Sequence, residues 1–195
     1  MKKTINGRAT EYPIDDIFLK RHSPRAMSGD AISKEELMTL FEAAHWAPSS
    51  YNIQPWRFVY GMRGTQEFDK LFSFLGDFNK SWCNNAAVLV VTISKKTGDK
   101  GQPSVTHSFD SGSAWMSLAL QAQTMNLVAH GMSGFDYERA KGVLNLTDEY
   151  SVEMMIAIGK HGKVEDLPEA IRPGEKPNDR KPLAGMVFEG YFPNK

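Results

Sequence analysis

One short segment, residues 86–93, constrains the fold of this chain more than any other part of the sequence. It is an almost unbroken run of aliphatic side chains, and a strand of that composition is typical of a sheet that is covered on both faces. We therefore predict a buried strand here. Helical and strand-like patterns alternate along the rest of the chain, which indicates a mixed fold of helices and strands.

The helices are predicted from apolar spacing and from capping residues. Ser33 and Glu36 form a capping box, and apolar side chains follow at helical spacing until Pro48 ends the helix. The other predicted helices cover residues 14–19, residues 65–75 after a Thr65 cap, a central segment of roughly twenty residues that begins at Ser108, and residues 136–144. Strands are predicted over 56–60 and 152–159, a polar loop over 98–103, and a tight loop over 131–134.

The last part of the chain differs in character from the rest. Pro168, Pro173, Pro177 and Pro182 prevent regular structure there. The residues that follow are nevertheless too apolar to stay in water, namely Met186, Val187, Phe188, Tyr191 and Phe192. Such an arm packs either on a partner subunit or back on its own domain, and the sequence alone leaves both open.

Length and charge limit the classes of function. The chain has 195 residues with 23 basic and 23 acidic side chains, which fits a single domain over residues 1–195. The balanced charge removes the broad attraction used by nucleic-acid binders, and no apolar stretch is long enough to span a bilayer. Cys83 is the single cysteine and cannot form an intrachain disulfide. We therefore expect no nucleic-acid or membrane role and predict a cytoplasmic location.

Several common catalytic signatures are missing. The sequence has no G-x-G-x-x-G after a strand, no Walker lysine loop and no G-x-S-x-G elbow. The five histidines have no partner at metal-ligand spacing, so no metal site is expected. Cys83 stands alone before the buried strand, and we expect it to pack as a small apolar side chain rather than to act as a nucleophile.

Two loops rich in hydrogen-bond donors are the positive signals. The first covers residues 21–25, where two guanidiniums and a hydroxyl can fork onto a phosphate; a solvated basic turn at a helix end is the simpler interpretation. The second covers residues 48–56, a turn bracketed by prolines. The simpler interpretation of this turn is an ordinary connector from helix to strand. It places Asn52, Gln54 and Trp56 where small residues would suffice, and rigid loops with many donors commonly hold ligands.

At these loops the sequence resembles the FMN-dependent nitroreductase superfamily. The segment Arg21-His-Ser-Pro-Arg25 is similar to its first signature, and residues 44–58, AHWAPSSYNIQPWRF, are similar to its second. Further matches follow in the same order: residues 131–136 resemble the flavin-contacting loop after the long central helix, residues 156–159 the last core strand, and residues 180–183 the C-terminal phosphate-binding motif. The resemblance covers nearly the whole chain.

The resemblance implies a set of FMN-binding residues. Arg21, Ser23 and Arg180, with Lys181, would bind the FMN phosphate, and His22 contributes its backbone to the same turn. Arg25 would lie at the N1 and O2 edge of the flavin, where its charge tunes the redox chemistry. The turn formed by Pro48, Ser49, Ser50 and Asn52 would reach the flavin bound mainly by the other subunit of a homodimer.

The loop over 131–134 would place Met132, Ser133 and Gly134 beside the flavin N5 edge. Better-studied members carry an acidic residue at the position of Ser133, but the family contact there uses the backbone, which survives the substitution. The segment over 94–105 is short compared with members that insert a helical lid, which implies an open pocket.

The fold implied by the resemblance is an α+β, three-layer α/β/α sandwich. Its central sheet is mainly antiparallel and flanked by helices, and a C-terminal arm wraps the dimer partner. The implied activity is an FMN oxidoreductase that takes hydride from NADH or NADPH and reduces nitroaromatics, quinones or related electron-poor acceptors by a ping-pong mechanism. No side chain need act as a catalytic acid or base. The alternatives are a specialised flavoenzyme of the same fold, either a dehalogenase or an enzyme that uses oxygen, and an FMN-binding protein without turnover.

Overall fold

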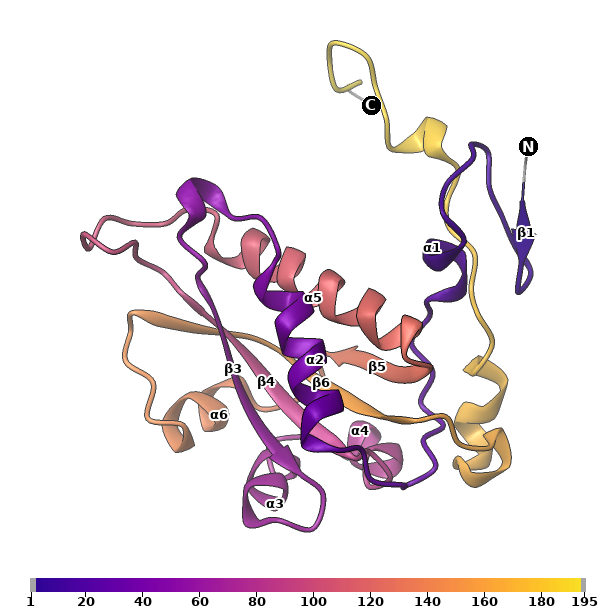
Figure 1. Ribbon diagram of the computed structural model, residues 1–195, viewed down its shortest axis with the longest axis horizontal. Coiled ribbons are helices and arrows are strands. Elements are labelled where there is room, and N and C mark those ends of the chain that lie inside the picture. Colours follow the sequence, from indigo (N-terminus) through magenta and orange to yellow (C-terminus); the bar gives the residue numbers. More distant parts are fainter. Residues whose placement is uncertain (1–2, 194–195) are drawn as a thin grey trace.

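The centre of the molecule is a four-stranded antiparallel sheet (Figure 1). A computed structural model describes residues 3–193. The strands lie in the order β3 (Trp56–Met62), β4 (Val88–Lys95), β6 (Tyr150–Lys160) and β5 (Leu127–Met132). The predicted buried strand is therefore an inner strand, and the side chains of Val88, Leu89, Val90 and Val91 are fully buried.

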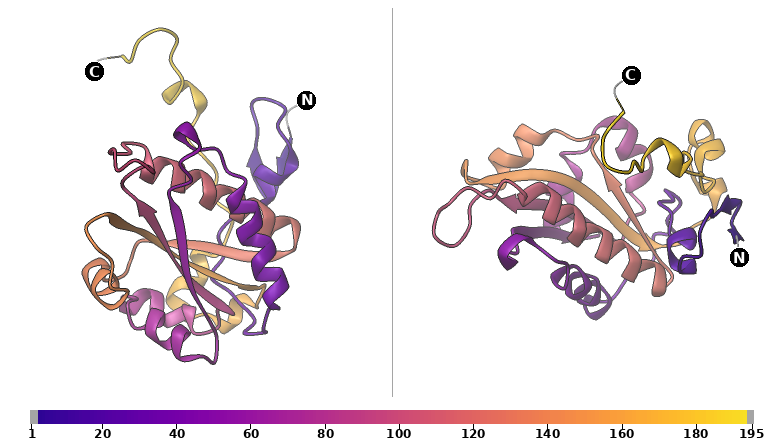
Figure 2. Two further views of the ribbon diagram at one scale, coloured as in Figure 1. Left: turned by 60° about the vertical axis from the view of Figure 1, so that its left-hand side comes forward. Right: turned by 90° about the horizontal axis from the view of Figure 1, so that it is seen from above.

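Helices cover both faces of the sheet (Figure 2). One face carries α2 (Lys34–His45) and α5 (His107–Thr124). The other carries α3 (Gln66–Phe72), α4 (Asp77–Cys83) and α6 (Tyr137–Val143). The result is a three-layer α/β/α sandwich with an antiparallel sheet, as the resemblance implies.

The two faces are specified by side-chain alternation along the strands. In β6, Ile156 and Ile158 pack under α2 and α5, whereas Met155 and Ala157 pack under α3 and α4. Because successive side chains of a strand point to opposite faces, one apolar run supplies two cores. The predicted alternation in residues 152–159 is confirmed, although the strand itself is longer.

The predicted helix starts are confirmed at three positions. The Ser33 hydroxyl accepts from the Glu36 N–H at 3.0 Å, and the Glu36 carboxylate accepts from the Ser33 N–H at 2.7 Å. Thr65 and Asp136 likewise cap α3 and α6 through their side chains. Each of these contacts satisfies a backbone N–H that a helix terminus otherwise leaves without a partner.

Three elements differ from the sequence-based prediction. The tight loop predicted over 131–134 is wrong for Gly131 and Met132, which belong to β5 and pair with β6. The helix α4 was not predicted, and the N-cap residue before it, Gly76, supplies no side-chain cap. The N-terminal hairpin of β1 (Thr4–Ile5) and β2 (Arg8–Ala9) was also missed, although its Asn6-Gly7 turn is a common hairpin signal.

The C-terminal segment crosses from the sheet to the N-terminal end of the chain. It contains the 3-10 turns η2 (Val164–Asp166), η3 (Glu169–Gly174) and η4 (Leu183–Gly185), and it passes beside α1 (Asp16–Lys20) and the hairpin (Figure 1). After η4 the chain leaves the body of the molecule, and Tyr191 and Phe192 are 79% and 77% exposed. This arm therefore does not pack back on its own domain.

Among residues 3–193, no helix is both long enough and apolar enough to cross a membrane.

Candidate functional site

A cavity of about 280 Å³ lies where the turn after α1 meets the segment that follows η3. The Arg21 N–H closes the last turn of α1 on the Ile17 carbonyl at 2.9 Å. The chain is then extended up to Pro24, since proline disfavours helix at the residue before it. The lining residues come from the hairpin, this turn, β5 and the C-terminal segment: Arg8, Arg21, His22, Ser23, Arg25, His130, Gly174, Glu175, Lys176, Pro177, Asn178 and Arg180.

Three arginines, Arg8, Arg21 and Arg180, give one end of this cavity a strong positive charge. Burial, with the nearby Arg180 charge, lowers the pKa of Arg8; burial, with the Arg8 and Arg180 charges, lowers the pKa of Arg21. Among residues 3–193, none of the three forms an ion pair with a carboxylate. Like charges held together in this way favour an anionic ligand, which would offset their mutual repulsion.

Arg8 connects the two halves of the cavity wall. Its side chain is only 5% exposed. It donates to the carbonyls of Leu19 at 2.9 Å and Arg21 at 2.6 Å on one side, and to the carbonyl of Asn178 at 2.8 Å on the other. A buried guanidinium that is satisfied by backbone carbonyls keeps its charge while it fixes the surrounding backbone. Arg8 therefore aligns the Arg21 turn with the Arg180 segment.

The residues predicted to bind phosphate converge with one exception. Arg21 and Ser23 lie side by side, with the guanidinium donating to the hydroxyl at 3.3 Å, and Arg180 lines the same cavity from the C-terminal segment. His22 also lines it, with its ring 3.2 Å from the Lys20 carbonyl. Lys181 instead lines a neighbouring cavity of about 590 Å³ between the hairpin and residues 179–183. The predicted placement of Lys181 in the same wall is therefore not found.

Arg25 also lines this cavity and is held through its backbone. One oxygen of the Glu175 carboxylate accepts the N–H groups of Arg25 at 2.6 Å and Ala26 at 2.7 Å. The Arg25 guanidinium lies 5.7 Å from the centre of the Phe78 ring, and its Nε is buried without a hydrogen-bond partner among the described residues. The side chain of Arg25 thus stays available to a ligand while Glu175 fixes its position.

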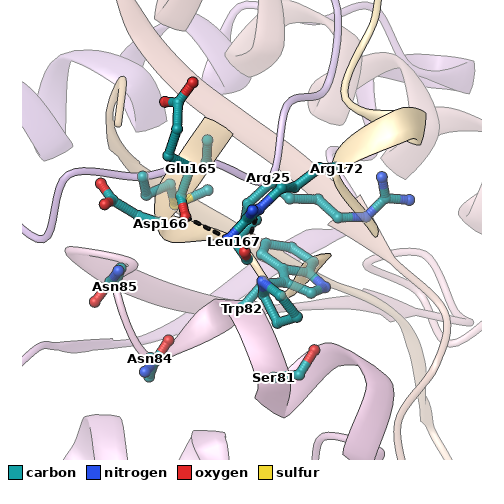
Figure 3. A pocket seen from close by; sticks show the side chains of 12 residues that line it. Arg25, Ser81, Trp82, Asn84, Asn85, Glu165, Asp166, Leu167 and Arg172 are labelled. Atoms are coloured by element: carbon teal, nitrogen blue, oxygen red, sulfur yellow. Dashed lines mark hydrogen bonds between the residues drawn. The ribbon is translucent and has the colours of Figure 1, made fainter. Parts of the chain in front are cut away.

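Arg25 also lines a second cavity of about 280 Å³ (Figure 3). Arg172 lies beside Arg25 in this cavity and donates to the carbonyls of Leu167 at 2.9 Å and Glu165 at 2.8 Å. Trp82 lies beneath Arg25 in this view. Arg25 therefore lines two polar cavities.

His130 supports the turn from the sheet. Its Nδ1 lies 3.0 Å from the Pro24 carbonyl, and its ring packs against Trp82 with 4.8 Å between ring centres. Burial lowers the pKa of His130, the nearby Arg25 charge lowers it further, and the Glu175 charge opposes this effect. His130 is therefore neutral at pH 7 and donates its Nδ1 proton to the carbonyl.

This burial predicts a loss of stability in mild acid. The unfolded chain binds protons near the ordinary histidine pKa of 6.5, whereas the folded chain binds them at lower pH at both His130 and His161. The contribution of these two histidines to stability is therefore fully present above about pH 7. It is lost as the pH falls through their lowered pKa values. Urea unfolding at pH 7.5 and 5.5 should show this decrease, and His130→Gln should make it smaller. An unchanged decrease in His130→Gln would contradict this role.

The predicted N5 loop has one side chain that cannot face a ligand. Met132 is 4% exposed, and its sulfur lies 3.3 Å from the Cys83 sulfur in the core. Ser133 and Gly134 are exposed at the end of β5. The Gly134 carbonyl accepts from the Gly76 N–H at 3.0 Å and from the Asn79 side chain at 2.9 Å, which holds the loop against α4. A side chain at Gly134 would come within 2.8 Å of Asn79.

Pro48, Ser49, Ser50 and Asn52 do not meet these residues within one chain. The 3-10 turn η1 (Ser50–Asn52) lies at the end of the molecule opposite α1 and the N-terminal hairpin (Figure 1). The cavity is therefore built from one part of the predicted site, and the second motif lies on a different surface.

Sequence reasoning missed Arg8, His130 and Glu175. The Asn6-Gly7 turn could have placed Arg8 on a strand. No local pattern indicates that Arg8 is buried or that Glu175 contacts a turn 150 residues earlier. Cys83 is buried as expected, and burial raises the pKa of its thiol. This agrees with an unreactive side chain.

Comparison with known proteins gives a consistent result. The model of the nitroreductase family matches residues 18–74. A crystal structure described as an oxidoreductase containing FMN has a TM-score of 0.94 and 43% identity, and the match covers 99% of this chain and 100% of that one. Protein DrgA of Synechocystis is 28% identical in an alignment of 181 residues, and the match covers 78% of this chain and 85% of DrgA. An NADH dehydrogenase of Thermus thermophilus is 24% identical in an alignment of 170 residues, and the match covers 72% of this chain and 83% of that protein.

Proposed function

Because the chain belongs to the nitroreductase family, we propose that it is an FMN-dependent oxidoreductase that takes hydride from NADH or NADPH and reduces nitroaromatic, quinone or related electron-poor acceptors. The whole chain acts as one nitroreductase-like domain in the cytoplasm, where its single, buried Cys83 stays reduced. When bound, FMN supplies the hydride chemistry at its N5 atom. The observation that carries the proposal is the cavity lined by Arg8, Arg21 and Arg180 without carboxylate partners among the described residues.

The donor set of the cavity fits FMN. Arg21, Ser23 and Arg180 would hold the phosphate, because guanidiniums form strong charge-assisted hydrogen bonds to phosphate oxygens. Arg8 aligns the Arg21 turn with the Arg180 segment through its hydrogen bonds to the carbonyls of Arg21 and Asn178. Arg25, which lines the same cavity, would lie at the pyrimidine edge of a bound flavin. Its positive charge would stabilise negative charge at that edge.

The second motif completes the site from a partner subunit. The turn η1, which contains Ser50 and Asn52, lies at the end of the molecule opposite α1 (Figure 1), so the residues of this motif would contact a flavin only in a second copy. The exposed C-terminal arm supplies apolar side chains for such a dimer, and it wraps the partner. These two surfaces support a homodimer with FMN at the subunit interface.

The acceptor side of the pocket is open. The segment between β4 and α5 forms a short turn in which Thr97 pairs with Pro103, and the Gly98 N–H donates to the Gln102 carbonyl at 2.8 Å. A pocket without a helical lid admits the nicotinamide and then a flat acceptor in turn, as a ping-pong mechanism requires. Comparison of nitroaromatic, quinone and oxygen acceptors in the steady state separates this activity from that of a specialised dehalogenase or oxygen-using enzyme.

Titration with FMN tests the proposal. We expect the purified protein to bind one FMN per chain, with quenching of free flavin fluorescence and a shifted visible spectrum. Riboflavin, which lacks the phosphate, is expected to bind more weakly because the arginines lose their ligand. A protein that binds neither flavin, or that binds both equally, would contradict the assignment of this cavity.

A further inference from the structure

The loop over residues 49–54 is held in an unusual backbone conformation. Tyr51, Asn52 and Gln54 have φ values of 50°, 56° and 52°, which lie in the left-handed region. A residue other than glycine is strained there, by an amount on the order of 1–2 kcal/mol for most side chains. Such a conformation persists only where surrounding contacts hold it. Within the loop, the Ser49 hydroxyl accepts the Gln54 N–H at 3.0 Å.

A buried carboxylate on α5 supplies a contact from outside the loop. Asp110 is 4% exposed, and its Oδ2 accepts the Ser50 N–H at 3.2 Å and the Thr106 hydroxyl at 2.9 Å. A buried carboxylate needs such donors, and a hydrogen bond to a charged group is stronger than one between neutral groups. Asp110 therefore joins the loop to the helix.

The start of α5 is itself fixed to the sheet. The ring of His107 lies 2.7 Å from the Ser94 hydroxyl of β4, and it lies 3.5 Å from the Glu153 carboxylate of β6. Rigid elements position a functional group more accurately than loops do. The path from the sheet through α5 to Asp110 thus sets the position of the Ser50 backbone.

We propose that Asp110 is a positioning residue for the flavin site of the partner subunit. It holds the Ser49–Ser50 backbone in the conformation that contacts that flavin. The inference rests on the proposed function, because the loop acts on FMN only if the two subunits share their sites. It predicts that a defect at Asp110 appears in the site of the other subunit.

The first test is FMN affinity in homodimers. Asp110→Ala removes the acceptor and leaves the Ser50 N–H without a partner, so FMN binding should weaken roughly 10- to 100-fold. Asp110→Asn keeps an oxygen acceptor and should restore most of the affinity. Asp69→Asn, on the exposed surface of α3, is the matched control and should bind as wild type. Equal affinity of Asp110→Ala and wild type would overturn the proposal.

The decisive test uses mixed dimers with two affinity tags. In a dimer of one Asp110→Ala subunit and one Arg21→Ala subunit, one site combines both defects and the other has neither. We expect half the wild-type FMN occupancy, at wild-type affinity. If Asp110 instead serves its own subunit, each site carries one defect and no tight site forms, which would overturn the proposal.

Two further experiments address a variant that does not fold and a proposed function that is wrong. If Asp110→Ala does not fold, Thr106→Val removes one hydrogen-bond donor from the same carboxylate with little change in shape. The Thr106→Val homodimer should bind FMN more weakly, and a mixed dimer of one Thr106→Val subunit and one Arg21→Ala subunit should again contain one site of wild-type affinity. Absence of that rescue would contradict the proposal. If the wild-type protein binds no FMN, the proposed function is wrong. If the wild-type protein binds FMN and Asp110→Ala binds it equally well, the proposed function stands and only the role of Asp110 is wrong.

Discussion

A chain in which Arg21 and Arg180 are both replaced by alanine is expected to bind FMN about a thousandfold more weakly than the wild type. Each guanidinium lines the cavity without a carboxylate partner among the described residues. A charge-assisted hydrogen bond contributes about 1.5–3 kcal/mol, so two of them account for roughly 10²- to 10⁴-fold in affinity. Fluorescence titration with FMN measures the change.

Riboflavin provides the internal control for that experiment. Because it lacks the phosphate, its affinity should be the same in the wild type and in the double variant. Arg139→Ala, which removes an exposed arginine of α6, should leave FMN binding unchanged. An equal loss of FMN and riboflavin binding would mean that the substitutions disturb the fold rather than remove a phosphate site.

A chain that ends at Gly185 is expected to be monomeric and to lose FMN. This truncation removes the exposed apolar side chains of the C-terminal arm, including Val187, Tyr191 and Phe192, which are 68%, 79% and 77% exposed. Burial of such side chains contributes roughly 1.5–3 kcal/mol each for a fully buried one, so their loss removes a large part of the association energy. Sedimentation velocity measures the oligomeric state, and absorbance measures the flavin content.

The matched control is Glu189→Ala within the same arm, which removes a charge but none of the apolar side chains. We expect this variant to stay dimeric and to keep FMN. A truncated chain that is still a dimer with bound FMN would contradict the role of the arm. A truncated chain that is monomeric but binds FMN at wild-type affinity would contradict the shared site.

The sequence predicts the inner strands and the large helices, because their signals are local and strong. Residues 86–93 are almost entirely aliphatic, and the capping box at Ser33 appears in the structure as predicted. The strand β5 was missed because Ala129, His130 and Gly131 have little preference for a strand. Its pairing with β6 depends on contacts far along the chain.

The candidate site was predictable only in part. From the residues alone, the turn over 21–25 could be a solvated basic turn, and it was the ordered set of motifs that indicated a phosphate site. The structure brings Arg21, Ser23 and Arg180 to one cavity. The burial of Arg8 and its bond to Asn178, 170 residues away, depend on tertiary packing, which no local pattern encodes.

Anaerobic mixing of the FMN-loaded protein with NADH or NADPH tests the central claim most directly. We expect the visible flavin absorbance to bleach with at least one of the two nucleotides. It should then recover when a nitroaromatic or a quinone is added after the nucleotide has been removed. Flavin bands that neither nucleotide bleaches would show that the protein binds FMN without this reaction, which would contradict the proposed oxidoreductase activity.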